Sequence, residues 1–323
     1  MGAFGLQTHI WNNNWKSVAL LAGFPVLLLV LLYGLSVGYV SMTAPINSVE
    51  EGLILALEHM TRIWPFALIG AGVWFAIAWF SYQKIIDVSV GAHGLSRKEA
   101  PEIYNLLENL CVSRGLTMPG LNIIETPALN AFASGLDDKS YKVTVTRGLI
   151  DTLDKQELEA VLAHELTHIM NRDVRLLIIS VIFVGIFSFF GELIFRSMFR
   201  TGLRVGGHTR SRKGDSRGGG VLILIAVALI VVAYLLAMVI RFSLSRKREY
   251  LADAGAVELT RNPDAMISAL RKISGHSDIE APNDIQQMMI ENTAPFAGVF
   301  ATHPKIEKRI EALVAFGGGQ TRT

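Results

Sequence analysis

The residues with the clearest chemical potential lie between Ala160 and Asp173, in the run A-V-L-A-H-E-L-T-H-I-M-N-R-D. His164 and His168 are four residues apart, and Glu165 follows the first of them, which is the spacing H-E-x-x-H. On an α-helix, residues i and i+4 share a face, so both imidazoles can reach one metal ion. Glu165 is then placed to act as general base on a water molecule at that metal. The spacing predicts a zinc peptidase site, against the simpler interpretation of two histidines on a surface helix.

The residues around this motif predict the helix that it needs. Asp154 and Glu157 have the D-x-x-E spacing of a helix start. Apolar residues then recur at helical intervals: Leu158, Val161, Leu162, Leu166 and Ile169.

A catalytic zinc site needs a third protein ligand and an open position for water. The best candidate is Glu249, in the run E-Y-L-A-D, with Asp253 on the same helical face four residues later. Asp253 can then bond the second ring nitrogen of a ligand histidine and fix its tautomer. The spacing alone leaves a second interpretation equally open, in which both acids belong to a solvated charged face with Arg246, Lys247 and Arg248.

The composition indicates a membrane protein. Of 323 residues, 51% are hydrophobic, and the mean hydropathy is +0.39, which is too apolar for an ordinary soluble domain. The net charge of +2 shows no nucleic-acid signature. The single cysteine, Cys111, excludes an internal disulfide and a cysteine zinc cluster, and its apolar neighbours predict a buried thiol.

Four apolar runs are long enough to span a bilayer, and the segment 41–62 is expected to connect the first two. We therefore expect an integral membrane protein, mainly α-helical, with four hydrophobic helices and a zinc peptidase domain interrupted by the second pair. The runs are 18–40, 63–82, 176–195 and 221–240. The expected parts are an anchor (1–82), the first catalytic part (83–175), an apolar hairpin with a basic loop (176–240), the second catalytic part (241–316) and a flexible tail (317–323).

The catalytic parts carry signals for a small α+β domain. Ser96 and Glu99 predict a capped helix that ends near Gly115. The segments 121–125 and 141–146 read as strands of a small hairpin-like sheet. Later helices are expected to begin at Asn262-Pro263 and at Pro304.

Four ordered blocks resemble the HtpX family of membrane zinc metallopeptidases, which is related to the CAAX prenyl endopeptidases. They are T-R-G-L-I-D (146–151), E-A-V-L-A-H-E-L-T-H (159–168), S-R-K-R-E-Y-L-A-D (245–253) and T-H-P-K-I-E-K-R-I-E-A-L (302–313). The resemblance covers about 85–316 and implies a gluzincin-like domain in which Glu249 is the third zinc ligand. It also implies that His303 and Arg309 assist at the developing oxyanion. The segment Asn130, Ala131 and Phe132 is similar to the family's peptide-binding edge strand beside the zinc.

The resemblance implies an endopeptidase with one Zn²⁺ per chain that cleaves damaged or misfolded membrane proteins and unfolded polypeptides. Two alternatives remain. One is a non-catalytic membrane scaffold or chaperone, against which the intact motif argues. The other is a CAAX-type prenyl protein peptidase, for which four hydrophobic segments are too few to enclose a large chamber.

Ligand positions and charges predict the topology. His164 and His168 precede the run 176–195 and Glu249 follows 221–240, so this hairpin must leave and return on one side. Basic residues near its ends favour the cytoplasmic side of an inner membrane for the catalytic domain and both termini: Arg172, Arg175, Arg241, Arg246, Lys247 and Arg248. The loop 196–217, with seven basic residues, runs against that orientation.

Overall fold

The computed structural model describes residues 6–182, 185, 217–242, 247–279, 288–290 and 304–317. The chain divides into two compact units. One contains residues 18–80 and 180–241, and its described part consists of long apolar helices. The other contains residues 1–17, 81–179 and 242–323, and it holds the sheet and the H-E-x-x-H helix.

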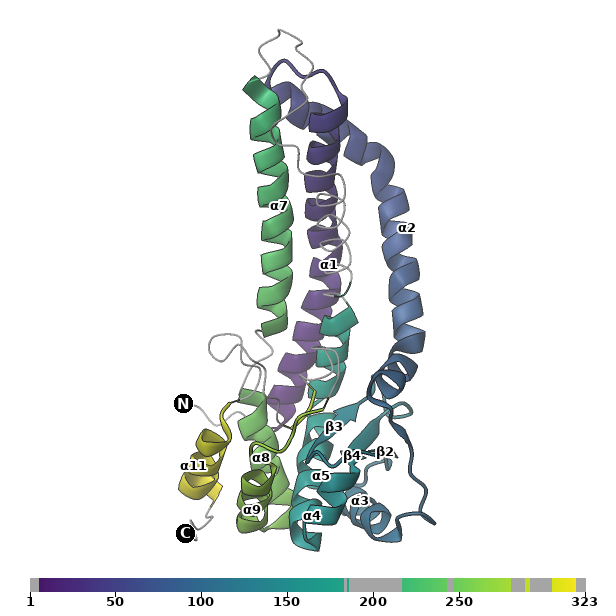
Figure 1. Ribbon diagram of the computed structural model, residues 1–323, viewed down its shortest axis with the longest axis vertical. Helices are drawn as coiled ribbons and strands as arrows, with labels where there is room; N and C mark the ends of the chain where they lie inside the picture. The colour runs from purple at the N-terminus through teal and green to yellow at the C-terminus, as the bar shows by residue number, and fades with distance from the viewer. Residues whose placement is uncertain are drawn as a thin grey trace. The chain divides into compact units, whose positions relative to one another are not determined.

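Three helices among the described residues are long and apolar enough to cross a membrane. Their candidate spans are Ala22–Thr43, Val49–Val90 and Gly219–Leu236. They lie in α1 (Leu6–Thr43), α2 (Val49–Val90) and α7 (Arg217–Phe242) (Figure 1). Of the fourth predicted run, 176–195, the part up to residue 182 is helical, and most of the rest lies outside the described residues.

The predicted connection 41–62 is wrong for most of its length, because α2 already begins at Val49. The Ser48 hydroxyl accepts a hydrogen bond from the Glu51 amide at 3.1 Å, and the Glu51 carboxylate accepts one from the Asn47 amide at 2.9 Å. These reciprocal hydrogen bonds cap the start of the helix. The acids in its first turn interact favourably with the positive end of the helix dipole, so they stabilise a helix here and do not indicate a loop. At 42 residues, α2 is about 60 Å long, roughly twice the thickness of a bilayer's hydrocarbon core.

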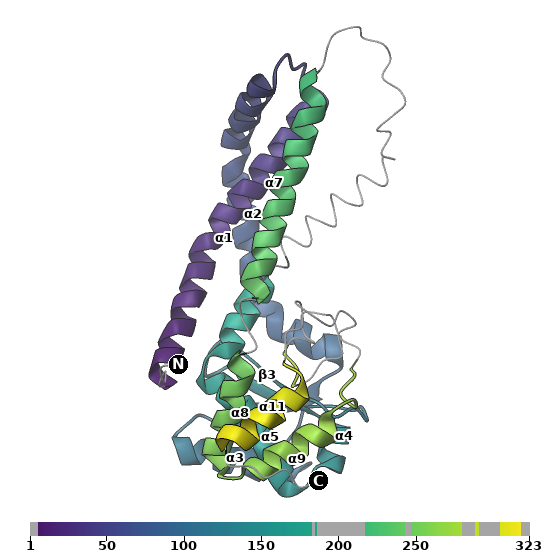
Figure 2. The same ribbon diagram turned by 90° about the vertical axis from the view of Figure 1, so that its left-hand side faces the viewer.

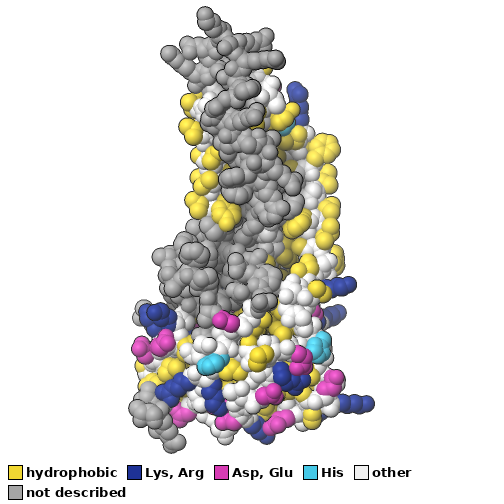
Figure 3. All heavy atoms as spheres, viewed as in Figure 1, with side chains coloured by type: hydrophobic (Ala, Val, Ile, Leu, Met, Phe, Trp, Pro, Cys, Tyr) yellow, Lys and Arg dark blue, Asp and Glu magenta, His cyan; other side chains and the backbone are white. Residues whose placement is uncertain are grey.

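The long helices pack around small residues and leave apolar side chains exposed. A buried cluster joins α1, α2 and α7, and a Cβ on Gly34 of α1 would lie 3.1 Å from the Leu229 Cβ of α7. Phe66 and Phe80 of α2 are 74% and 84% exposed. In Figure 3 the described side chains of these helices are largely hydrophobic, whereas the other unit carries many charges. Such exposed apolar surface is typical of helices that face lipid.

The second unit contains a four-stranded mixed sheet in the order β1-β2-β4-β3. The expected hairpin of segments 121–125 and 141–146 is wrong, since these two strands, β2 and β4, are parallel neighbours. The connection between them supplies β3, which pairs antiparallel with β4 and forms the edge of the sheet. The strand bounds are β1 (His93–Gly94), β2 (Gly120–Ile124), β3 (Ala131–Ser134) and β4 (Lys142–Thr146).

The first helix of this unit, α3 (Pro101–Arg114), begins later than its cap signal predicted. Ser96 and Glu99 do form their hydrogen bonds, at 2.6 and 2.8 Å. However, Ala100 precedes a proline and has φ −142° and ψ 72°, so helical backbone starts only at Pro101. The predicted end at Gly115 is confirmed by its left-handed φ of 64°. Cys111 of α3 is buried as predicted, and burial raises the pKa of its thiol to about 11.

Helices α8 and α9 pack against α5, and α11 packs against α8 and α9 (Figure 2). The predicted start of α9 is confirmed, because Pro263 is its first residue and the Asn262 side chain caps the Ala265 amide. The helix bounds are α4 (Arg147–Thr152), α5 (Lys155–Met170), α8 (Lys247–Thr260), α9 (Pro263–Ile273) and α11 (Ile306–Gly317).

Candidate metal centre

Helix α5 carries the H-E-x-x-H motif, and its predicted start is confirmed. The Asp154 carboxylate accepts hydrogen bonds from the Gln156 and Glu157 amides at 2.8 and 2.9 Å, and the Glu157 side chain accepts one from the Asp154 amide. The buried Glu157 carboxylate also accepts a bond from Lys272 of α9 at 2.6 Å. Hydrogen bonds on both sides therefore hold the first turn of α5, and this fixes the direction of the motif about two turns later.

The two motif histidines converge on one point. Their Nε2 atoms lie 3.2 Å apart, and their rings are nearly perpendicular, at 89°. The His164 side chain is fully buried and that of His168 is 13% exposed. Two Nε2 atoms at this distance can bind the same metal ion.

Helix α8 brings Glu249 to the same point. Its two carboxylate oxygens lie 3.6 Å from the Nε2 atoms of His164 and His168. In a tetrahedral zinc site with bonds near 2.0–2.1 Å, ligand atoms are about 3.3 Å apart. The separations of 3.2 and 3.6 Å therefore fit a single metal ion, and His164, His168 and Glu249 form a group that could hold one.

Close packing of α5 on α8 makes this convergence possible. A Cβ on Gly255 of α8 would overlap Thr167 Cγ2 and lie 2.7 Å from its Oγ1. Thr167 directly precedes His168 on α5. Glycine at 255 thus lets α8 approach the motif helix closely enough to deliver Glu249.

Replacing Gly255 by alanine is expected to weaken metal binding and lower stability together. The added methyl group must push α8 away from Thr167, and such overpacking costs about 1–3 kcal/mol. Thermal unfolding of the metal-free protein and a zinc titration measure the two effects. Gly220→Ala, at a glycine with no atom within 4 Å of its added Cβ, is the control. Equal zinc affinity in both variants would contradict the role of the close approach.

Each ligand histidine is held on its other ring nitrogen by a buried carboxylate. His164 Nδ1 lies 3.0 Å from Asp253 Oδ1, and His168 Nδ1 lies 3.1 Å from Asp173 Oδ2. With Nδ1 bound to a carboxylate, each histidine directs its Nε2 atom at the metal position. The sequence pattern assigned Asp253 to this task but did not identify Asp173, an acid five residues beyond His168 that begins the helical segment after α5.

Arg309 of α11 closes the network behind Asp253. Its guanidinium donates twice to this carboxylate, from Nε at 2.9 Å and from Nη2 at 2.6 Å, and it is fully buried. Burial alone would raise the pKa of Asp253, but the charge and hydrogen bonds of Arg309 outweigh that effect and lower it. Burial would likewise lower the pKa of His164, yet the carboxylates of Asp253 and Glu249 raise it to about 9. The carboxylates therefore favour positive charge at His164.

Replacing Asp253 by asparagine is expected to lower both zinc affinity and stability. The amide cannot neutralise Arg309, and leaving a buried charge without its partner costs about 3–5 kcal/mol. Loss of the carboxylate behind a ligand histidine lowers metal affinity about 10–100-fold. Chemical denaturation and zinc titration check these values. Unchanged zinc affinity would show that Asp253 only neutralises Arg309.

Glu165 differs from the other acids of the site because its carboxylate has no hydrogen-bond partner among the described residues. Both oxygens are buried and unbonded, and the residue is 1% exposed. Burial raises its pKa above the ordinary value, an effect that the nearby histidines oppose. A desolvated carboxylate beside the metal ligands is suited to take a proton from water.

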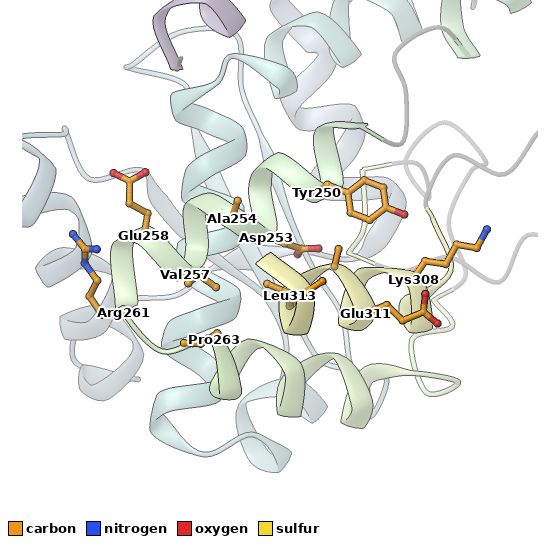
Figure 4. Close-up of a pocket in the computed structure, with 12 residues that line it drawn as sticks. Tyr250, Asp253, Ala254, Val257, Glu258, Arg261, Pro263, Lys308, Glu311 and Leu313 are labelled. Atoms are coloured by element: carbon orange, nitrogen blue, oxygen red, sulfur yellow. The ribbon is translucent and has the colours of Figure 1, made fainter. Parts of the chain in front are cut away.

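The space at the ligands is small. A cavity of about 20 Å³ is lined by Glu165, His168 and Glu249, together with Arg248 and Met288. A larger hollow of about 900 Å³ lies between α8 and α11 (Figure 4). Asp253 lines this hollow, but the three metal ligands are not among its lining residues. The chemistry therefore belongs to the small cavity.

The other predicted site residues have different surroundings. Asn130 and Phe132 are buried at the edge strand β3, and the Asn130 amide donates to the Ser277 carbonyl at 2.8 Å. The Asn130 and Ala131 oxygens both accept hydrogen bonds from the amide of Ile290. His303 lies outside the described residues.

Comparisons with known proteins find similarity to peptidases. Residues 97–316 match the model of "Peptidase family M48". The chain is 44% identical to a protein named "Protease HtpX homolog" from Bacteroides fragilis, over 97% of this chain and 99% of that protein. A protein of the same name from Listeria monocytogenes is 36% identical over 95% and 99% of the two chains. The crystal structure of S. mikatae Ste24p is more distant, with a TM-score of 0.42 and 18% identity over 94% of this chain and 66% of that one.

Proposed function

This chain belongs to peptidase family M48, among the HtpX homologues, and from that premise we propose that it is a zinc-dependent endopeptidase that cleaves damaged or misfolded membrane proteins. It is a membrane metallopeptidase by family and by its apolar helices. The proposal of zinc rests on the convergence of two imidazole nitrogens and one carboxylate. The two nitrogens are 3.2 Å apart, and each is 3.6 Å from a carboxylate oxygen. Two nitrogens and one oxygen are a donor set typical of catalytic zinc.

The residues of the site have two separate roles in peptide hydrolysis, metal binding and proton transfer. When bound by His164, His168 and Glu249, zinc supplies a Lewis acid that lowers the pKa of water and polarises a carbonyl. Glu165 takes the proton from the attacking water and passes it to the leaving amine. Its lack of a hydrogen-bond partner among the described residues leaves both oxygens available for that transfer.

Positioning residues support these steps. Asp253 and Asp173 hold the ligand histidines with Nε2 directed inward, and Arg309 keeps Asp253 ionised. The resemblance assigns His303 and Arg309 to the developing oxyanion. For Arg309 the contacts support binding a peptide carbonyl, because its Nη1 already donates to the carbonyl of Ile290 at 3.0 Å.

Charge and chain order support a catalytic unit on the cytoplasmic side of an inner membrane, with both termini there. The chain enters the run 176–195 soon after His168 and leaves 221–240 shortly before Glu249. Basic residues near both points favour the cytoplasm. We propose that 176–195 is a fourth membrane helix and that the domain is gluzincin-like. Because the metal ligands lie close in sequence to these two apolar runs, we expect substrates that are themselves in the membrane.

Metal removal tests the proposal. Full-length protein in detergent is expected to cleave a destabilised membrane protein faster than its folded parent. A zinc chelator should abolish this cleavage, and one equivalent of Zn²⁺ should restore it. Cleavage that survives complete metal removal would contradict a zinc enzyme. Equal rates on the folded and the destabilised substrate would contradict the quality-control role.

The alternative of a non-catalytic scaffold makes the opposite prediction for the same assay. A scaffold would bind the destabilised membrane protein without cleaving it, with or without zinc. Among the described residues, the Glu165 carboxylate has no hydrogen-bond partner and lies beside three converging ligands. This favours the enzyme hypothesis over the scaffold, because a buried carboxylate without a catalytic role would only destabilise the fold.

A further inference from the structure

Three consecutive residues of the chain, Met288–Ile290, lie along the outer edge of β3. Phe132 of β3 and Met289 form an antiparallel bridge. The Ile290 amide donates to the Ala131 carbonyl at 2.9 Å and to Asn130 Oδ1 at 3.1 Å. The edge that is expected to bind a peptide is therefore already paired with a segment of the same chain.

Ile290 contacts the groups that the family resemblance and the proposed function assign to peptide binding. Its amide is bound by Asn130 and Ala131, and its carbonyl accepts a hydrogen bond from Arg309 Nη1 at 3.0 Å. One residue thus engages all three groups through its backbone alone. Backbone recognition does not depend on side-chain identity, so any extended peptide residue could make the same contacts.

The triplet also restricts the cavity at the metal ligands. Met288 lines this cavity together with Glu165, His168 and Glu249. Its volume of about 20 Å³ has room for about one water molecule and is too small for a substrate residue. With Met288 in this position, a peptide cannot reach the site along β3.

We propose that Met288–Ile290 is an internal competitor of the substrate. This segment occupies the outer edge of β3 (Ala131–Ser134), here called the peptide track, and must be displaced before a substrate binds. The inference rests on the proposed function. The three residues are 9%, 1% and 2% exposed, so the track takes apolar residues. An unfolded segment of a membrane protein has this chemistry, and it competes with the triplet for the same backbone donors and acceptors.

Competition of this kind changes affinity without changing the chemistry. If only a fraction of the molecules has the track open, the apparent Kd for peptide is the intrinsic Kd divided by that fraction. Weakening the triplet should therefore lower KM and leave kcat unchanged. A triplet that is a permanent strand of the sheet predicts no change in KM.

Replacing Ile290 by proline tests the competition, because proline removes the N–H that bonds Ala131 and Asn130. Zinc-loaded full-length protein with Glu165→Gln prevents cleavage, and a labelled peptide of residues 286–292, Q-Q-M-M-I-E-N, is the probe. Adding Ile290→Pro should tighten peptide binding at least tenfold, as measured by fluorescence anisotropy. Met266→Ala is the matched control, since Met266 is equally buried but lies in α9. Equal peptide affinity with and without Ile290→Pro would overturn the proposal.

A disulfide tests the same idea without depending on how well the proline variant folds. The antiparallel register places Met288 opposite Ala133, and both side chains line the cavity. In Ala133→Cys/Met288→Cys, also with Glu165→Gln, oxidation should abolish peptide binding and dithiothreitol should restore it. Each single-cysteine variant should show no response to oxidant, because Cys111 is buried.

The outcomes distinguish failure of the competitor proposal from failure of the peptidase proposal. If the oxidised and reduced proteins bind peptide equally, the competitor is disproved and the peptidase proposal stands. If zinc-loaded proteins of every kind bind no peptide and the enzyme with Glu165 intact cleaves none, the proposed function fails and the competitor falls with it.

Discussion

Replacing Glu165 by glutamine is expected to reduce kcat/KM for peptide hydrolysis by roughly 10³-fold, within the range measured for loss of a general base. The amide keeps the size of the side chain but cannot accept the proton of the attacking water. Zinc content should stay at one per chain, because Glu165 is not among the three converging ligands. Steady-state cleavage and metal analysis of the same preparation check both parts.

The stability of this variant gives a second and independent result. The Glu165 carboxylate is buried with no hydrogen-bond partner among the described residues, and an unsatisfied buried charge is costly. Glutamine removes the charge, so the melting temperature of the metal-free protein should stay equal or rise. Glu159→Gln, on the same helix but partly exposed, should leave activity unchanged. Full activity in Glu165→Gln would exclude it as the base.

Replacing Glu249 by alanine is expected to lower zinc affinity by more than about 100-fold, since even partners behind the ligands contribute 10–100-fold. Two histidines then remain, and the carboxylate oxygens 3.6 Å from both Nε2 atoms are lost. Hydrolysis should fall with the metal and recover in part at high zinc concentration. Metal analysis after dialysis against a buffered zinc solution measures the affinity.

The control for this prediction lies on the same helix. Glu258 of α8 forms an ion pair with Arg114 at 2.7 Å, and its side chain is 61% exposed. Glu258→Ala should therefore change zinc affinity little and stability by less than about 1 kcal/mol. Equal zinc affinity in Glu249→Ala and Glu258→Ala would refute Glu249 as the third ligand.

Local patterns predicted the motif helix well. The Asp154–Glu157 cap, the apolar stripe behind His164 and His168 and the buried Cys111 all depend on residues within a few turns of one another. The start of α9 and the end of α3 are of the same kind. Such features follow from helix geometry and capping chemistry, which short stretches of sequence contain in full.

Predictions failed where two signals competed or where partners were distant. Acids near Glu50 suggested a connection, but Ser48 and Glu51 cap a helix there. The strand pattern at 121–125 and 141–146 carried no information on direction, and β2 and β4 proved parallel. Period-two alternation identifies a strand, but which strand it pairs with is decided by the rest of the sheet.

The sequence by itself determined the chemistry of this protein: two histidines and a base on one helix face, and several apolar runs for a membrane. Only the tertiary structure decided that Glu249, far along the chain, meets those histidines. It also placed Asp173 and Arg309 around the site and Met288–Ile290 on the edge of β3. The physical reason is that a ligand set is a matter of a few ångströms, and those distances depend on packing such as that of Gly255 against Thr167, which no local pattern specifies.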